Sequence, residues 1–364
     1  MLSLRTSCST TLAARPVGPN TDGPPPLRKM ILPALFVGGL FYVSFTRTPP
    51  VPPLIVVSGE ALGTTWTMKV AEAPSEAREA ELRALVETTL AAVDQSMSTY
   101  RPDSELMRFN TADGLEPVAL SSGLGAVIAE AMDIGEITGG AFDVTVGPLV
   151  NAWGFGPDKR RIAPDSATIA QLRSRVGTDK LELTEAGLTK THPEVFVDLS
   201  AIAKGHAVDR VVSRLASAGA KDVLMEVGGE IVARGSNPAG QPWRLGIETP
   251  TSAGRDVLKA VSLNNTAMAT SGDYRNYYEV DGKRVSHLID PRSMSPIEHN
   301  LASVTVVHQR CSTADAWATA LSVLGDDEGF LLAEAQGLQA FFIMREADGS
   351  FTSKSTTSFK ALEQ

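Results

Sequence analysis

The stretch that decides the fold class is Tyr274-Arg-Asn-Tyr-Tyr-Glu-Val280, followed by Asp281-Gly282 and then Lys283-Arg-Val-Ser-His-Leu-Ile289. Both flanks have strand composition, and an Asp-Gly pair between two such runs is a strong signal for a two-residue hairpin turn. A hairpin joins antiparallel strands, whereas parallel strands need long crossovers. The stretch therefore predicts an α+β fold with mixed or antiparallel sheets, and it disfavours a doubly wound parallel sheet.

Short strands and medium helices alternate on both sides of this hairpin. Further strand signals lie at 64–70, 195–199, 223–227, 230–234, 243–248, 303–308 and 338–344. Apolar residues at helical spacings predict helices over 75–96, 122–137, 165–176 and 206–218, and another that begins near Ser312. The pattern predicts one unit in which helices flank the sheets.

Composition and missing motifs exclude several functional classes. Of the 364 residues, 43% are hydrophobic and 21% charged, as in an ordinary folded protein. Beyond residue 48 the chain holds 28 basic and 41 acidic residues, which disfavours a nucleic-acid binder. The two cysteines, Cys8 and Cys311, cannot build a disulfide framework or a Cys-based zinc site. No dinucleotide-binding G-x-G-x-x-G, P-loop, H-E-x-x-H or G-x-S-x-G motif occurs.

The N-terminus resembles a targeting segment. Residues 1–29 hold four basic residues and one acid, and residues 30–46 include the apolar run Ile31–Phe45. As a helix this run would rise about 22 Å, short of a hydrocarbon core of roughly 30 Å. We expect a signal anchor or a signal h-region, with the remainder exported. An uncleaved anchor is favoured; cleavage, a buried core helix and a start at Met30 remain open. Residues 47–57 are interpreted as a linker and 58–364 as the globular domain.

The helix that begins near Ser312 carries a candidate metal site. Asp315 and Thr319 stand four residues apart, so that both side chains leave the same face. Oxygen donors of this kind suit Mg²⁺ or Ca²⁺. The alternative interpretation is a capping box from Ser312 to Asp315, with Thr319 incidental.

A second candidate lies at the predicted junction between strand 195–199 and the helix that follows. Asp198 and Lys204 could bind a polar ligand there, and the helix N-terminus could face a phosphate. The alternative is that Asp198 or Ser200 is a plain N-cap and Lys204 a solvated surface residue.

The third candidate is His287. Strand alternation places it on one face with Val285 and Ile289, and its imidazole is the best general-base candidate among the five histidines. The alternative is a satisfied core histidine. The preceding stretch 271–278 offers aromatic and hydroxyl groups that could flank a planar ring or simply pack on the sheet.

Taken in order, the motifs resemble the ApbE-type FAD:protein FMN transferases. The resemblance covers residues 59–325, and its most specific block is Gly140-Ala-Phe-Asp-Val-Thr-Val-Gly-Pro-Leu-Val-Asn-Ala-Trp-Gly-Phe-Gly156. The other matching stretches are Leu62–Trp66, Met97–Leu106 with Phe109-Asn110, Asp198–Gly205, Glu226–Glu230, Ser271–Tyr274, His287–Arg292 and Ala314–Thr319.

The resemblance implies a mixed α/β flavinyltransferase that uses Mg²⁺ to transfer FMN from FAD to a Thr or Ser of an acceptor protein, releasing AMP. It implies FAD contacts from Leu62, Tyr100, Ala141, Phe142, Asp143, Asp198, Lys204 and Ile289. It implies metal ligation by the Ala201 carbonyl, Asp315 and Thr319, and catalytic roles for His287 and Asp315. The expected setting is the bacterial inner membrane, with the catalytic domain on the periplasmic side. The expected acceptor belongs to a membrane or exported redox complex.

Two positions depart from the family pattern. Leu62 replaces the usual Met, a change that conserves volume. Ser293-Met294 stands where the family usually has Thr-Gly, and if that position needs a positive φ, Met294 strains the loop after His287 or reshapes it. Two other functions remain open: an FAD pyrophosphatase that uses water, and an exported flavin-binding module without catalysis.

Overall fold

The computed structural model describes residues 53–156, 162–251, 256–274, 276–280 and 283–363. The predicted basic segment and anchor, and most of the linker, lie outside these residues. The Asp281-Gly282 turn does too. In the described part of the chain, no helix is long and apolar enough to cross a membrane. Residues from Pro52 onward form one compact unit.

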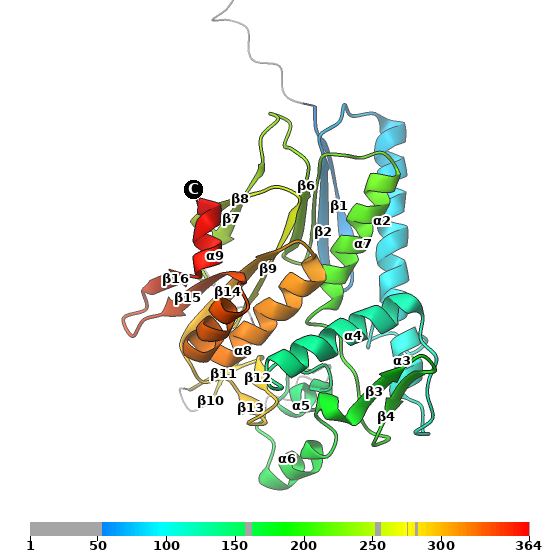
Figure 1. The fold of residues 1–364 in the computed structure, drawn as a ribbon, viewed down its shortest axis with the longest axis vertical. Coiled ribbons are helices and arrows are strands. Elements are labelled where there is room, and N and C mark those ends of the chain that lie inside the picture. The colour runs from blue at the N-terminus through cyan, green and yellow to red at the C-terminus, as the bar shows by residue number, and fades with distance from the viewer. Residues whose placement is uncertain (1–52, 157–161, 252–255, 275, 281–282, 364) are drawn as a thin grey trace, which may run out of the picture. The chain divides into compact units, whose positions relative to one another are not determined.

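A single eight-stranded sheet organises this unit (Figure 1). Its order is β1-β2-β5-β6-β9-β14-β15-β16, and every neighbouring pair is antiparallel. The strands are β1 (Ile55–Ala61), β2 (Thr64–Val70), β5 (Val223–Val227), β6 (Glu230–Arg234), β9 (Thr266–Gly272), β14 (Leu301–His308), β15 (Gln339–Arg345) and β16 (Phe351–Ser355). The α+β prediction is confirmed, and the main sheet is antiparallel throughout.

Alternate residues along the strands face two different cores. In β15, Phe342 packs with the larger core, whereas Phe341 and Ile343 pack with the smaller one. The larger core lies beneath three helices: α2 (Glu76–Met97), α7 (Ala203–Ser217) and α8 (Cys311–Ala335) (Figure 1). The smaller core lies on the other face, beneath the ribbon of β7 (Trp243–Glu248) and β8 (Val257–Leu263) and helix α9 (Thr357–Lys360). The sheet is thus buried on both faces around β6, β9, β14 and β15, whereas alternate residues of β1 are exposed on one face.

The remaining elements connect these layers, and the longest of them, α4, also packs in the larger core. The helices are α3 (Glu105–Asn110), α4 (Ser122–Ile137), α5 (Gly147–Ala152) and α6 (Ser166–Arg173), with 3₁₀ turns η1 (Thr178–Lys180) and η2 (Ala361–Glu363). Two-stranded ribbons are formed by β3 (Leu181–Thr184) with β4 (Gly187–Lys190), β10 (Tyr277–Val280) with β11 (Lys283–Ser286), and β12 (Ile289–Asp290) with β13 (Ser295–Pro296). Val280 pairs with Lys283, which confirms the predicted hairpin.

Two strand predictions need correction. Residues 195–199 form no strand, because the side-chain amide of Asn110 pairs with them instead: its Nδ2 donates to the Val197 carbonyl at 2.9 Å, and its Oδ1 accepts from the Val197 N–H at 2.8 Å. The strand predicted through Ile289 is broken at His287 and Leu288. His287 therefore does not share one strand face with Val285 and Ile289.

Candidate active site

A cavity of about 930 Å³ lies where the central sheet opens. Strand β6 pairs with β9 only through Ile231–Ala233, so the end of β9 continues beyond it, and both line the cavity. Eleven of the twelve sequence-predicted site residues line it: Tyr100, Ala141, Phe142, Asp143, Asp198, Ala201, Lys204, His287, Ile289, Asp315 and Thr319. Leu62 is not among the described lining residues. It lies in the β1–β2 turn with φ 53° and packs against the larger core.

The N-terminal turns of α7 and α8 meet at the floor of this cavity. Asp315 of α8 accepts a hydrogen bond from the Gly205 N–H of α7 at 3.0 Å. In return, Asp209 of α7 accepts from the N–H groups of Cys311 and Ser312 at 2.9 and 3.0 Å. A Cβ on Gly205 would lie 2.4 Å from the Cys311 carbonyl oxygen, so only glycine permits this approach. Each helix thus supplies the carboxylate that caps the other.

Both local-cap interpretations are therefore wrong. Arg310 is the N-cap of α8 and Ile202 that of α7, and neither uses its side chain as a cap. The Ser312 hydroxyl contacts Glu130 of α4 instead. Asp198 accepts from the N–H and hydroxyl of Ser200, which forms a tight turn before α7 rather than a helix cap.

Three charged groups stand together beside these helix ends. The Lys204 ammonium lies 2.7 Å from Glu230 Oε1 and 3.6 Å from Asp315 Oδ1. Lys204 is 30% exposed, whereas Glu230 and Asp315 are buried, so the interpretation of Lys204 as a solvated surface residue is wrong. Burial alone would lower the pKa of Lys204, but the charges of Asp315 and Glu230 outweigh it and raise that pKa. The ammonium is therefore charged at neutral pH.

The second Glu230 oxygen, Oε2, is buried without a hydrogen-bond partner within the described chain. Burial raises the pKa of Glu230, Asp315 raises it further, and the Lys204 ammonium opposes both. The 2.7 Å contact favours the ionised carboxylate. Sequence inspection assigned Glu230 no role. Glu230 lies two residues before Val232, which faces the larger core. Because alternate strand residues share a face, this spacing could have indicated an inward-facing acid.

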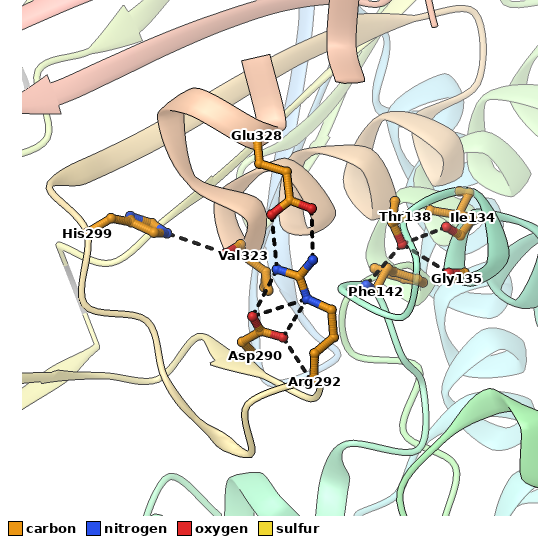
Figure 2. A network of polar contacts seen from close by, with 9 residues as sticks. All are labelled: Ile134, Gly135, Thr138, Phe142, Asp290, Arg292, His299, Val323 and Glu328. Carbon is orange, nitrogen blue, oxygen red and sulfur yellow. Dashed lines mark hydrogen bonds and ion pairs between the residues drawn. The ribbon is translucent and has the colours of Figure 1, made fainter. Parts of the chain in front are cut away.

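The loop after α4 positions the predicted flavin contacts. The Thr138 hydroxyl donates to the carbonyls of Ile134 and Gly135 and accepts from the Phe142 N–H at 3.2 Å, as Figure 2 shows. Asp143 is buried and accepts from both the N–H and the hydroxyl of Thr145. Burial raises the pKa of Asp143, and the bonds from Thr145 oppose that rise. The bonds from Thr145 thus hold the Asp143 carboxylate of the Gly140–Gly156 block in a fixed orientation.

His287 is fixed through one ring nitrogen. Its Nδ1 lies 2.9 Å from the Asn276 carbonyl oxygen, which requires the proton on Nδ1 and leaves Nε2 as the base. The edge-on ring of Phe155 lies 6.2 Å from the imidazole, centroid to centroid. Burial lowers the pKa of His287, opposed by the Asn276 carbonyl. The imidazole is therefore neutral at pH 7 and able to accept a proton.

The loop that follows His287 is held at both ends. Arg292 bridges Asp290 and Glu328 at 3.0 and 2.9 Å, and this ties the loop to α8 beyond its kink at Gly325 (Figure 2). Met294 has φ 63°, so the position does require the left-handed region. The Trp153 indole N–H donates to the Met294 carbonyl at 3.1 Å. The buried Met294 side chain belongs to a small apolar cluster that includes Leu149, Leu172, Val176 and Ile289.

Comparisons with known proteins identify the family of this chain. The ApbE family model matches residues 62–342, and the chain belongs to the ApbE family. A Haemophilus influenzae protein named FAD:protein FMN transferase is 43% identical, covering 85% of this chain and 92% of its own length. An Escherichia coli protein of the same name is 38% identical over 90% of this chain and 96% of its own.

Solved structures extend the likeness to the fold. The flavin transferase ApbE from Vibrio cholerae superposes with a TM-score of 0.78 at 41% identity, covering 85% of this chain and 99% of that one. The apo flavinyl transferase ApbE from Pseudomonas stutzeri gives the same TM-score at 38% identity, with 85% and 96% covered.

Proposed function

We propose that this chain is an enzyme that transfers the FMN part of FAD to a Ser or Thr hydroxyl of an acceptor protein and releases AMP. One observation carries the proposal: Lys204, His287, Asp315 and Thr319, which come from separate parts of the sequence, line one cavity. The names of relatives that are 38–43% identical over most of the chain support the same reaction.

In this reaction the acceptor oxygen forms a bond to the FMN phosphorus. The bond between that phosphorus and the bridging pyrophosphate oxygen breaks, and its electron pair leaves with AMP. The hydroxyl proton is released. FAD and acceptor thus give a phosphodiester-linked FMN, AMP and one proton, with no oxidant or reductant needed. Such a transfer depends mainly on alignment of the groups and neutralisation of the phosphate oxygens.

The chain's own residues supply these two requirements. The Lys204 ammonium and the first turn of α7 place positive charge where a pyrophosphate would lie. The Nε2 atom of His287 accepts the hydroxyl proton, because Nδ1 is already held by Asn276. Phe142, Asp143 and Ile289 line the cavity beside His287 and would hold the flavin end.

A magnesium ion fits the donors that these helices present. The Asp315 carboxylate, the Thr319 hydroxyl and the Ala201 carbonyl would hold it; Asp315, Thr319 and Ala201 line the cavity, and their donors are all oxygen atoms. When bound, Mg²⁺ would neutralise negative charge on the pyrophosphate oxygens. In the described residues, no group of three or more His, Cys, Asp or Glu side chains could hold a metal. The proposed site therefore relies on hydroxyl, carbonyl and substrate oxygens.

We further propose that the catalytic unit works on the periplasmic face of a bacterial inner membrane. The basic residues 1–29 before the apolar run 31–45 support this orientation. An acceptor in a membrane or exported redox complex, with a Ser/Thr-Gly-Ala-Ser/Thr segment, would then lie in the same compartment.

The test is incubation of the purified full chain with FAD, Mg²⁺ and a candidate acceptor. We expect a flavin-fluorescent acceptor band on a denaturing gel and one AMP for each labelled acceptor. A matched acceptor with Ala in place of its target Ser or Thr should remain unlabelled. AMP release with no labelled acceptor would instead select the pyrophosphatase, and FAD binding without AMP would select the non-catalytic module.

A further inference from the structure

The Glu230 carboxylate has no role in the proposed function, yet it lines the same cavity as Lys204 and Asp315. It is 3% exposed, it lines the cavity, and only one of its two oxygens has a partner in the described chain. A buried carboxylate is costly unless it is paired, and here the pairing is with Lys204. The position of that lysine therefore depends on Glu230.

Lys204 has two carboxylates within reach and makes a hydrogen bond to only one. Its ammonium is 2.7 Å from Glu230 Oε1 but 3.6 Å from Asp315 Oδ1, beyond an N–H···O hydrogen bond. The other Asp315 oxygen, Oδ2, accepts the Gly205 N–H at 3.0 Å. Asp315 Oδ1 is therefore the oxygen that a cation from solution would take, and Lys204 stands next to it.

The turn between β5 and β6 holds Glu230 on the far side of the lysine. Gly229 N–H donates to Glu226 Oε1 at 2.7 Å, which closes this turn. A Cβ on Gly228 would lie 3.4 Å from the Lys204 Cδ atom, so the turn packs directly along the lysine stem. Glu230 thus draws the ammonium toward the sheet, whereas Asp315 projects from the helix layer.

We propose that Glu230 is a positioning residue that keeps the Lys204 ammonium off Asp315, so that Asp315 Oδ1 stays open to a divalent cation. Without the Glu230 charge, Asp315 is the partner left for Lys204. The flexible lysine stem then lets the ammonium close onto Oδ1. An incoming cation would have to displace it. This inference rests on the proposed function, because it concerns the Asp315 site assigned there.

The test begins with a crystal structure of the cation-free full chain carrying Glu230→Gln. We expect the Lys204 ammonium within hydrogen-bonding distance of Asp315 Oδ1. Simple loss of a negative charge would also weaken cation binding, but it would leave the lysine in place. A structure in which Lys204 remains apart from Asp315 would overturn the inference.

The second measurement is a titration with Mn²⁺ followed by electron paramagnetic resonance, with FAD present and acceptor absent. We expect Glu230→Gln to weaken Mn²⁺ binding roughly 10- to 100-fold, the usual effect of removing an outer-shell partner of a metal site. Glu230→Asp, which retains the charge, should restore most of the affinity. Glu130→Gln is the matched control, because Glu130 contacts the first turn of α8 through Ser312 and Thr313.

The outcomes separate the two proposals. A wild-type chain that binds no Mn²⁺ would refute the metal assignment, while the position of Lys204 in the Glu230→Gln crystal structure would still decide the inference. Equal Mn²⁺ affinity in wild type and Glu230→Gln would overturn the inference alone.

Discussion

At the scale of single residues, His287 shows how one contact selects a chemical role. The Asn276 carbonyl oxygen holds Nδ1, and the edge-on Phe155 ring lies nearby, so Nε2 is the nitrogen left to accept a proton. Burial lowers the pKa of His287 below its ordinary value of about 6.5. The imidazole is therefore uncharged at neutral pH.

This arrangement predicts the acid limb of the pH profile. Only neutral His287 accepts a proton, so kcat/KM should rise with pH through a value below 6.5 and then level off. His287→Gln should remove this limb and lower kcat by roughly 10²- to 10⁴-fold, the usual share of a general base. Steady-state rates from pH 4.5 to 8 check both. An acid limb that persists in His287→Gln would assign it to another group.

Met294 gives a second prediction at this scale. Its φ of 63° costs roughly 1–2 kcal/mol in a non-glycine residue, but its buried side chain contributes more, because deletion of a core methionine side chain costs about 2–5 kcal/mol. Met294→Gly should therefore destabilise the chain, and Met294→Ala should destabilise it further, since alanine keeps the strain. Urea unfolding measures the free energy of unfolding of wild type and the two variants and so gives their order of stability. A Met294→Gly chain more stable than wild type would contradict it.

At the scale of elements, α7 and α8 depend on each other's carboxylates. Asp209→Ala removes the acceptor of two N–H groups at the start of α8 and should cost about 1–2 kcal/mol, as the loss of a helix cap does. Asp133→Ala, on the exposed face of α4, is the matched control and should change stability little. Denaturant midpoints measure both; equal midpoints for the two variants would refute the mutual cap.

The first turn of α7 also carries a pH-sensitive group. Burial, with Arg210 and Arg310 nearby, lowers the pKa of His206 to about 4. Because the unfolded chain takes up this proton near pH 6.5, stability should be full above that pH and fall as the pH drops toward 4. His206→Gln should flatten this part of the stability curve. Unfolding free energies measured at several pH values between 4 and 7 test this expectation.

Elements with strong local signals were predictable from the sequence, and those specified by distant partners were not. Helix α4 and strands β5, β6 and β7 lie where apolar periodicity places them. Strand β9 was missed because its run Thr-Ala-Met-Ala-Thr-Ser-Gly is small and polar, although it is central in the sheet. The caps of α7 and α8 could not be predicted, because each comes from the other helix.

The site residues also fall into those with a local sequence signal and those specified by distant partners. Residue chemistry alone indicated five of the residues that meet in the cavity: Asp198, Lys204, His287, Asp315 and Thr319. The other six were implied only by the family resemblance. Glu230 was missed as a functional group, since its role depends on a lysine 26 positions away and on the turn that packs along it. The break at His287 was missed because alternation alone does not show where a strand ends.

At the scale of the whole molecule, the cavity couples ligand binding to stability. A ligand that binds only the folded chain adds about 2.7 kcal/mol when present at 100 times its Kd. FAD should therefore raise the melting temperature of the full chain in a dose-dependent manner. Tyr100→Ala should reduce this gain without changing the ligand-free melting temperature, because Tyr100 lines the cavity yet is 75% exposed. A loss of ligand-free stability in this variant would assign Tyr100 a packing role instead.

The mutual capping of α7 and α8 also has a consequence for biosynthesis. The Gly205–Asp315 bond joins residues 110 positions apart, and the Asp209–Cys311 bond spans 102. A chain still emerging from the ribosome has α7 long before it has α8, so it carries the lysine of the site but neither Asp315 nor Thr319. Such a chain cannot assemble the cavity floor until α8, in the last quarter of the chain, has folded against α7. We therefore expect FAD met during synthesis to remain intact until then.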